Sequence, residues 1–385
     1  MKFSCTQENL HQGLAIVSHI ASKNINLPIL SNVLIKCDNG VLRFMTTNLE
    51  IAIDCVVRGK IEDAGEFTVP SKLFADYVAL LPKERVDVNL EGNSLSIACG
   101  SYKTTLHGVA ASEFPLIPTI DRKHRIAVRV ADLKKAIGQV LFAVAPNESR
   151  PEISGVLMKF VPGGAEGLKV VMAGTDSYRL AEKMLPAGGD SGAGLSEPIS
   201  VIVPARTVAE LIRILGIFKD EASGPADIEI FIGDNQILFA YNGTEIISRT
   251  IEGKYPDYRQ LIPERFETEV VLEKEELLRA VKTTSLFSRT GLNDVHFAFK
   301  SEHPIHVNSR NAQTGEHAVD LEGVVTGKDN EVTVNFRYFI DGVSNIESEA
   351  VTMQMIDGMS PCVLRPVTEG QHGPDYLYIV MPIRQ

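Results

Sequence analysis

The densest group of side chains that could take part in chemistry is the run Thr175-Asp176-Ser177-Tyr178-Arg179-Leu180. A carboxylate and a guanidinium two to three residues apart, beside hydroxyl groups, could bind a substrate or move a proton. The same residue types also build turns, because Asp and Ser side chains accept hydrogen bonds from nearby backbone amides. No paired base and nucleophile accompany the run. It therefore favours a structural turn beside a binding groove over an enzyme site.

Other catalytic or metal-binding motifs find little support. Gly189-Asp190-Ser191-Gly192 echoes the nucleophile segment of chymotrypsin-like proteases, but it lies in a Gly/Ala/Ser-rich stretch, 187–196, that predicts a flexible loop. The chain contains no GxSxG, GxxxxGK[ST] or CxxC motif and no HExxH among its nine histidines. We expect no metal, no cofactor and reduced, buried thiols at the five cysteines, which are Cys5, Cys37, Cys55, Cys99 and Cys362.

The composition predicts a large globular protein, in which any role on DNA would have to rest on local charge or on topology. With 385 residues, 44% of them hydrophobic and 23% charged, the chain is long enough for two or three domains. It has neither a membrane-length apolar run nor the apolar core of a signal peptide, so we expect a cytoplasmic protein. The net charge of −11 argues against a tight, general nucleic-acid binder.

A repeated pattern supplies the elements that must position these residues. Three β-rich tetrads, Phe67–Pro70, Val201–Pro204 and Val332–Asn335, each precede an amphipathic helix, and they recur about every 130 residues. Solenoid repeats are much shorter, so this period indicates duplicated whole domains. A first helix also opens each copy, at 7–21, 131–144 and 274–286, followed by alternating strands such as those around Asn39-Gly40. Proline-bearing stretches near 115–125 and 256–268 are typical of linkers.

The pattern predicts an α+β fold in which each copy is a doubled β-α-β-β-β unit, with helices on one side and sheets on the other. The predicted domains are 1–122, 123–262 and 263–385. On the helix at 205–215 we expect Arg206, Glu210 and Arg213 to form the exposed face. The six helical spans carry nine basic and seven acidic residues, so the acidic excess of the chain lies elsewhere. This indicates either a mildly basic shared surface or ordinary solvated helix faces.

Six segments in order make the chain resemble the bacterial sliding clamp, the β subunit of DNA polymerase III. They are Leu27-Pro28-Ile29-Leu30, Phe67-Thr68-Val69-Pro70, Thr175–Leu180, Val201-Ile202-Val203-Pro204, Tyr255-Pro256-Asp257-Tyr258-Arg259 and Val380-Met381-Pro382-Ile383-Arg384. The resemblance implies a non-catalytic processivity factor: a head-to-tail homodimer closed into a ring of six DNA-clamp domains around duplex DNA, with helices lining the channel. Its implied partners are the clamp-loader complex, the replicative polymerase and other proteins that carry short clamp-binding peptides.

The resemblance also implies a peptide-binding pocket between the second and third domains, an apolar groove in which Arg and backbone groups fix the direction of the peptide. Tyr178 replaces a His that is common in the family. The tail from Met381 onward is expected to lie beyond the ladder of the last strand. The implied pocket residues are Ile153, Thr175, Ser177, Tyr178, Arg179, Leu180, Pro256, Leu261, Met359, Pro361, Val380, Met381, Pro382, Ile383 and Arg384.

Two further sets of positions carry over from the family. Lys72 and Arg206, each just after a Val-Pro step, are expected to contact DNA, with Lys23, Lys134 and Arg150 as further candidates. Leu106, Leu286 and Phe287 are expected at the subunit interface. Two alternatives stay open: a monomeric clamp-like scaffold, which light scattering would reveal, and an enzyme that uses the 175–179 cluster, which a hydrolase substrate panel would test.

Overall fold

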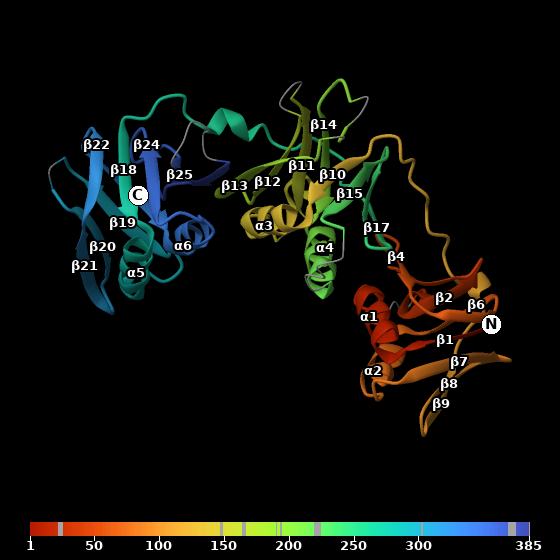
Figure 1. The fold of residues 1–385 in the computed structure, drawn as a ribbon. Coiled ribbons are helices and arrows are strands. Elements are labelled where there is room, and N and C mark those ends of the chain that lie inside the picture. Colours follow the sequence, from red (N-terminus) through yellow and green to blue (C-terminus); the bar gives the residue numbers. More distant parts are fainter. Residues whose placement is uncertain are drawn as a thin grey trace. The chain divides into compact units, whose positions relative to one another are not determined.

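A computed structural model describes residues 1–21, 26–146, 149–163, 167–189, 191–192, 195–218, 225–301, 303–368 and 375–384 (Figure 1). The chain divides into two compact units. The first comprises Met1–Val130, Ala187–Leu195 and Ala209–Thr250, and the second comprises Ala131–Pro186, Ser196–Val208 and Ile251–Gln385. No helix in the described part of the chain is both long and apolar enough to cross a membrane.

Helices and strands follow one another in the same order three times. The first copy contains β1 (Lys2–Thr6), α1 (Gln7–Val17), β2 (Asn32–Asp38), β3 (Val41–Thr47), β4 (Ile51–Val57), β5 (Lys60–Asp63), β6 (Gly65–Pro70), α2 (Ser71–Ala79), β7 (Arg85–Glu91), β8 (Ser94–Cys99) and β9 (Tyr102–His107). The second contains β10 (Ile126–Arg129), α3 (Val130–Leu141), β11 (Gly155–Pro162), β12 (Leu168–Thr175), β13 (Arg179–Pro186), β14 (Ile199–Pro204), α4 (Ala205–Ile217), β15 (Asp227–Ile232), β16 (Gln236–Tyr241) and β17 (Thr244–Arg249).

The third copy repeats this order. It contains β18 (Thr268–Glu273), α5 (Lys274–Thr284), β19 (Asp294–Phe299), β20 (Ile305–Asn311), β21 (Gly315–Leu321), β22 (Gly323–Gly327), β23 (Asn330–Asn335), α6 (Phe336–Ser344), β24 (Ala350–Met355), β25 (Cys362–Pro366) and β26 (Tyr376–Val380). The predicted α+β class and the threefold doubled β-α-β-β-β unit are confirmed. Copies one and three add one short strand each, β5 and β22, which pair with β1 and β18 at equivalent places.

The strands form four sheets, and two of these sheets combine strands of neighbouring copies. The first unit holds a five-stranded sheet, β5-β1-β7-β8-β9, and an eight-stranded sheet, β10-β15-β16-β17-β4-β3-β2-β6. The second unit holds a nine-stranded sheet, β14-β11-β12-β13-β26-β25-β24-β18-β22, and a four-stranded sheet, β21-β20-β19-β23. The antiparallel pairs β4–β17 and β13–β26 join successive copies within one sheet.

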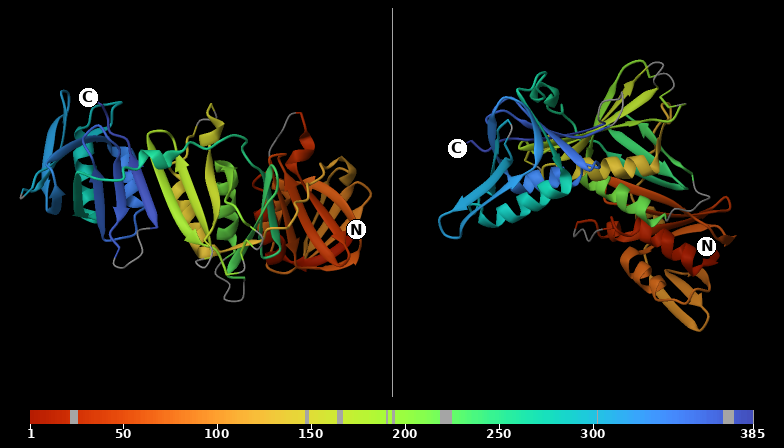
Figure 2. Two further views of the ribbon diagram at one scale, coloured as in Figure 1. Left: turned by 90° about the horizontal axis from the view of Figure 1, so that it is seen from above. Right: turned by 60° about the vertical axis from the view of Figure 1, so that its left-hand side comes forward.

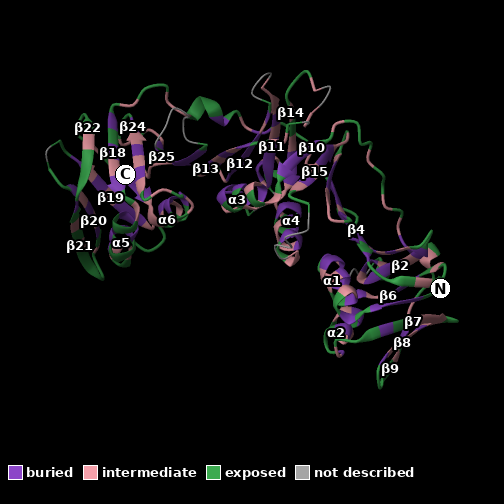
Figure 3. Ribbon diagram, viewed as in Figure 1, coloured by how far each residue is buried: buried purple, intermediate pink, exposed green. Residues whose placement is uncertain are grey.

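The core of each unit lies where helices meet sheets. In copy one, α1 packs against α2, β3 and β4, and Figures 1 and 2 show both helices on one side of the two sheets. Phe44 and Phe74 meet there with ring centroids 6.4 Å apart, both fully buried. In copy three, Phe339 of α6 makes a similar contact with Phe297 of β19, with ring centroids 5.0 Å apart. The buried residues follow these contacts along the inner helix faces (Figure 3). Each helix therefore has one face left for other contacts.

One predicted surface is wrong. On α4, Glu210 and Arg213 do not lie on an exposed face: Glu210 is buried, and Arg213 is half-buried. The Arg213 guanidinium donates to the carbonyl oxygens of Ala15 and Ile16, 2.9 and 2.7 Å away, at the end of α1. Helix spacing alone cannot show that a second helix end covers this face. Arg206 is exposed, as predicted.

Candidate partner-binding site

The polar run at 175–180 is a tight turn between β12 and β13. The Asp176 carboxylate accepts from the backbone amides of Tyr178 and Arg179 at 2.9 and 3.0 Å. The Thr175 hydroxyl donates to the Arg179 carbonyl at 2.7 Å and accepts from the Ser177 amide at 3.2 Å. Ser177 takes a left-handed backbone conformation, with φ of 78°. These bonds occupy the polar atoms that a catalytic interpretation would need, so they favour the structural turn.

Arg179 fastens this turn to helix α6. Its guanidinium donates to Asp176 at 2.9 Å, to Asp341 at 2.6 Å and to the Phe142 carbonyl at 2.8 Å. The guanidinium carbon also lies 4.6 Å from the Tyr338 ring centroid, where the π face attracts the cation. Burial acts to lower the pKa of Arg179, but hydrogen bonds and charge from the two aspartates outweigh it and raise that pKa. Arg179 therefore orders the site, and its donors are already engaged.

Below the turn, apolar side chains of the second unit form one cluster. Leu180, Tyr255, Tyr258, Val363 and Ile379 are buried together, and Met381 packs against them. Burial raises the pKa of Tyr258 above its ordinary range, and its hydroxyl donates to Glu182. This buried cluster, with the neutral phenol of Tyr258, forms the floor of the site.

Three of the predicted pocket residues are exposed apolar side chains. Tyr178 is 63% exposed, Leu261 46% and Met359 56%. Where such groups lie together on a surface, they are typical of binding sites. The remaining predicted pocket residues divide into a buried group and a more accessible group. Ile153, Thr175, Leu180 and Val380 are buried, whereas Ser177, Arg179, Pro256, Pro361, Met381, Pro382, Ile383 and Arg384 are partly or fully exposed.

The chain end closes one side of the cluster: it lies beyond the last strand, as expected, but backbone hydrogen bonds hold it in place. Val380 is the last residue of β26 and pairs with Arg179 of β13. The Met381 amide donates to the Tyr178 carbonyl at 2.9 Å, and the Ile383 amide donates to the Thr333 carbonyl at 2.7 Å. A strand that ends in proline-containing sequence can still continue hydrogen bonding at the residues beside the proline. The tail is thus an integral part of the site.

Two residues of the site, Tyr338 and Asp341, were not predicted from the sequence. Tyr338 stacks on Tyr178, with ring centroids 6.4 Å apart and planes at 21°, and Asp341 binds Arg179. Both residues lie on α6, one turn apart, beside the buried core residue Phe339. A helical-wheel plot of α6 would have placed them together, but not beside the 175–180 turn. Arg150, a candidate for DNA contact, lies here too: it binds Glu152 at 3.1 Å and the Ser177 hydroxyl at 2.9 Å.

The other basic candidates among the described residues lie on helices. Lys72, Arg206 and Arg337 are each the second residue of the second helix in their copy, and all three are exposed. Arg337 was not predicted, although it follows the third tetrad as the other two follow theirs. Lys134 is half-buried on α3, and Lys23 lies outside the described residues. No carboxylate of the described residues forms an ion pair with Lys72, Arg206 or Arg337.

The interface candidates differ in exposure. Leu286 is 74% exposed, and the neighbouring Phe287 ring stacks on His317 of β21 at 5.7 Å. Leu106 lies on β9 but is only 6% exposed, because it faces the core of its own sheet. Leu286 and Phe287 are therefore accessible for an apolar contact, whereas Leu106 already has one.

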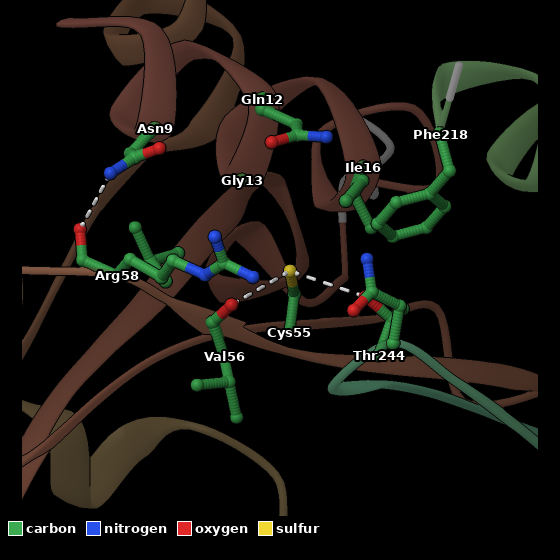
Figure 4. Close-up of a pocket in the computed structure, with 11 residues that line it drawn as sticks. Asn9, Gln12, Gly13, Ile16, Cys55, Val56, Arg58, Phe218 and Thr244 are labelled. Carbon is green, nitrogen blue, oxygen red and sulfur yellow. Dashed lines mark hydrogen bonds between the residues drawn. The ribbon is translucent and has the colours of Figure 1, made fainter. Parts of the chain in front are cut away.

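Two other places in the described structure could bind or react with a small molecule, but their geometry supports this less well. A cavity of about 90 Å³ beside Cys55 is lined by Asn9, Gln12, Arg58 and Phe218 (Figure 4). Burial raises the pKa of the Cys55 thiol to about 11, so it stays a poor nucleophile at neutral pH. Ser191 of the protease-like segment donates to the Ala127 carbonyl, and Asp190 lies outside the described residues. Among the described residues, no three His, Cys, Asp or Glu side chains gather as metal ligands.

Comparison with known proteins agrees with this architecture along the whole chain. Family models for the DNA polymerase III beta subunit match in order: the N-terminal domain over residues 1–118, the central domain over 127–257 and the C-terminal domain over 259–384. The beta sliding clamp of Synechococcus elongatus is 30% identical over 395 residues, covering 100% of this chain and 99% of that protein.

Solved structures give the same result. The DNA polymerase III beta subunit of Thermotoga maritima superposes with a TM-score of 0.88 at 26% identity, covering 100% of this chain and 99% of that one. The Pseudomonas aeruginosa sliding clamp, solved bound to griselimycin, gives a TM-score of 0.89 at 25% identity with 100% of both chains covered.

Proposed function

The chain belongs to the family of DNA polymerase III beta subunits, the sliding clamps of bacterial DNA replication, and from this premise we propose that two copies close head to tail into a ring around duplex DNA. The family is a non-catalytic processivity factor, so the chain is not an enzyme. Duplex DNA and the DNA polymerase are its partners in replication. We further propose that the chain forms a homodimer, that a clamp loader opens it, and that the residues named below make each contact.

The observation that carries the ring is a pairing rule inside the chain. The third strand after the first helix of one copy pairs with the last strand of the next copy: β4 with β17, and β13 with β26. In copy three the equivalent third strand is β21, and in copy one the equivalent last strand is β9. Both are edge strands of their sheets. The same rule, applied between two chains, pairs β21 of one protomer with β9 of its partner.

Such a pairing favours a closed assembly. Unpaired edge strands expose backbone donors and acceptors that another strand can satisfy. The contact is heterologous, since β21 and β9 are different surfaces, and two such contacts related by half a turn close a ring. Leu286 and Phe287 stand beside β21 and would add apolar area to this contact, with Leu106 supporting β9 from inside its sheet. The proposed domain boundary at 122 lies between the first two matched segments, and the one at 262 lies just inside the third, which begins at residue 259.

The charge pattern supports sliding over tight binding. We propose that Lys72, Arg206 and, at the equivalent position of copy three, Arg337 face the DNA phosphates, with Lys134 and Lys23 as further contacts. A few screened contacts give little affinity, and the net charge of −11 leaves the rest of the surface unattractive to DNA. A closed ring needs no strong affinity to stay on its template. Replication also requires a cytoplasmic protein and a loader that opens the ring.

The apolar cluster beside the 175–180 turn is the proposed docking site for partner peptides. The apolar side chains of a short segment would enter between Leu261, Met359 and Met381, and the Tyr178–Tyr338 stack would flank them. The polymerase, the clamp loader and other replication or repair proteins would compete for this one surface. Its rigid floor and exposed rim suit a peptide that binds in one orientation.

The deciding experiment loads the protein on a nicked circular plasmid with a clamp-loader complex and washes with about 1 M NaCl, where the screening length is about 3 Å. We expect retention on circles and release after the plasmid is linearised. Release from intact circles, with light scattering still showing a dimer, would contradict encirclement. A monomer by light scattering at micromolar concentration would favour the scaffold alternative instead.

A further inference from the structure

A second surface, in the first unit, repeats the backbone arrangement of the proposed peptide site. The turn between β3 and β4 corresponds to the 175–180 turn between β12 and β13. The Asn48 side-chain oxygen accepts from the amides of Glu50 and Ile51 at 3.0 and 2.8 Å, as Asp176 does for Tyr178 and Arg179. The Thr47 hydroxyl donates to the Ile51 carbonyl at 3.0 Å and accepts from the Leu49 amide at 3.0 Å, as Thr175 does in its turn.

The correspondence includes the conformation at the tip and the strand beside it. Leu49 has φ of 76°, against 78° for Ser177. The Arg249 amide donates to the Glu50 carbonyl at 3.0 Å, just as the Met381 amide donates to the Tyr178 carbonyl at 2.9 Å. Arg249 thus takes the place that Met381 has in the other site.

The floors of the two sites correspond as well. Ala52, Leu238 and Ile247 are buried together with Phe231. Ala52 pairs with Ile247, as Leu180 pairs with Ile379 in the other site. The linker that follows each copy closes both floors: Ile117 and Ile120 pack against the first one, and Tyr258 belongs to the second.

The first-unit surface is hollowed and apolar at its rim. A cavity of about 310 Å³ lies there, at the lower end of the size that ligand pockets have. Leu116 is 98% exposed and Leu49 is 47% exposed. A leucine with positive φ is sterically disfavoured, and such residues tend to occur at functional sites. The cavity is lined by Thr47, Leu49, Glu50, Ile51, Ala52, Leu116, Pro118, Gln236, Ile247 and Arg249.

The charges around the cavity indicate the ligand. Arg249 is exposed, and no carboxylate of the described residues forms an ion pair with it. It is the one cation of the lining, and Glu50 is the one anion there. Since the Glu50 carboxylate does not pair with it, the Arg249 guanidinium can bind a carboxylate from outside. The aromatic stack and the engaged arginine of the other site have no counterpart, because Glu50 and Ile51 stand where Tyr178 and Arg179 stand there. The two sites should therefore select different ligands.

We propose that this cavity is a second docking site for an extended peptide segment of a partner protein, with a leucine-sized side chain between Leu49 and Leu116 and an adjacent acidic group on Arg249. A second copy of the chain is a poorer occupant. The bordering strands β4, β16 and β17 are interior strands of the eight-stranded sheet, whereas the proposed subunit contact uses the edges β9 and β21. The inference takes only the class of ligand, a peptide, from the proposed function.

The test uses the full chain and two fluorescein-labelled peptides, Ser-Gly-Asp-Leu-Leu-Asp-Gly-Ser and the same peptide with both leucines replaced by serine. Binding is followed by fluorescence anisotropy up to millimolar protein. The starting protein carries Leu261→Ser and Met359→Ser, which remove the apolar rim of the 175–180 site. We expect it to bind one leucine peptide per chain and to bind the serine peptide at least about tenfold more weakly, since burying one such side chain is worth about 1.5–3 kcal/mol.

Adding Leu49→Asn and Leu116→Ser should lower the affinity for the leucine peptide by about tenfold or more. Adding Arg249→Gln instead should lower that affinity by about threefold or more. Asn is chosen because it tolerates positive φ. Leu80→Ser, at a position 84% exposed on the same unit, is the matched control and should change nothing. Thermal melting checks that each variant is folded. No binding to the starting protein, or binding that ignores Leu49→Asn and Leu116→Ser, would overturn the proposal and leave the 175–180 site unaffected.

Discussion

The carboxylate of Glu210 and the guanidinium of Arg213 lie 2.6 Å apart on α4, with Glu210 only 3% exposed. His19, whose ring nitrogen is 2.6 Å from the same carboxylate, and the last carbonyls of α1 complete the group. The cation at the end of α1 also matches the negative end of the helix dipole. This ion pair therefore joins a helix of copy two to a helix of copy one inside the first unit.

Glu210→Ala should destabilise the first unit, because it leaves the Arg213 charge partly buried without its carboxylate. Breaking one partner of a buried pair costs several kcal/mol, and the partial exposure of Arg213 reduces this to about 2–4 kcal/mol. Urea unfolding should show a lower midpoint with an unchanged slope. The control is Asp121→Ala, since Asp121 forms an exposed pair with Lys123 that water screens, so that its loss should change stability little. Equal midpoints for the two variants would contradict the prediction.

The same ion pair shows where sequence reasoning stops. The tetrads and helix periodicity were enough to predict the three copies and their doubled units, because each copy buries its own apolar faces. Glu210 and Arg213 have the spacing of an exposed face, and only the end of α1, about 190 residues away in sequence, buries them. Long-range contacts of this kind leave no periodic signal in a single sequence.

Only part of the candidate site, too, could be predicted from the sequence. The family resemblance marked Tyr178, Leu261 and Met359 as pocket residues, and all three are exposed. It could not separate them from Ile153 and Val380, which are apolar but buried in the fold. It also assigned Arg179 to peptide binding, although Asp176 and Asp341 hold its guanidinium. Exposure depends on strand order, and strand order was not predicted.

Stability should fall at high pH because the thiols are buried. Burial raises the pKa of Cys362 from its ordinary value of 9.0 to about 12. Between these values the unfolded chain releases the thiol proton while the folded chain keeps it, so the unfolding free energy falls as pH rises, by at most about 1.4 kcal/mol per pH unit for this group. Below pH 9 its contribution is fully present. Cys362→Ala, compared with wild type by denaturant unfolding from pH 8 to 11, should show a shallower fall. Parallel curves would contradict it.

Contacts between helix cations and phosphates should appear in the salt dependence of DNA binding. Lys72→Glu, Arg206→Glu and Arg337→Glu together remove up to three phosphate contacts per chain. Because the proposed ring contains two chains, the plot of log affinity against log salt for a short linear duplex should then lose up to about five units of slope. Lys83→Glu is the matched control, since Lys83 is exposed but bound to Glu8 at 3.1 Å. An unchanged slope in the triple variant would place the DNA elsewhere.

The subunit contact should be sensitive to charge beside β21. Leu286→Lys with Phe287→Lys would put two unpaired charges into an apolar contact, at a cost of several kcal/mol. Leu286 is 74% exposed in the single chain, so the monomer should stay folded while the dimer dissociates. Sedimentation velocity at sub-micromolar protein should show a shift from dimer to monomer. The exposed apolar position Val324, which is 64% exposed, supplies the control Val324→Lys. A dimer that persists in the double variant would show that these residues lie outside the interface.

The peptide site should lose affinity without loss of fold when its exposed rim is changed. Leu261→Ser and Met359→Ser remove two apolar contacts that a bound peptide would bury, each worth up to about 1.5–3 kcal/mol at full burial. Because both residues are about half exposed in the free chain, we expect a combined loss of about 10- to 100-fold. The probe is a labelled peptide from the tail of the replicative polymerase subunit, measured by fluorescence anisotropy.

Deleting residues 380–385 separates this binding role from a structural one. Val380 is fully buried, and the Met381 and Ile383 amides hydrogen-bond to the turn and to β23. The deletion should therefore abolish peptide binding and also lower the melting temperature, whereas the two rim substitutions should leave that temperature within about 2 °C of wild type. Peptide affinity that survives the rim substitutions in a folded dimer would move the docking site away from the 175–180 turn. A truncated chain that melts like wild type would mean that the tail hydrogen bonds contribute nothing to the fold.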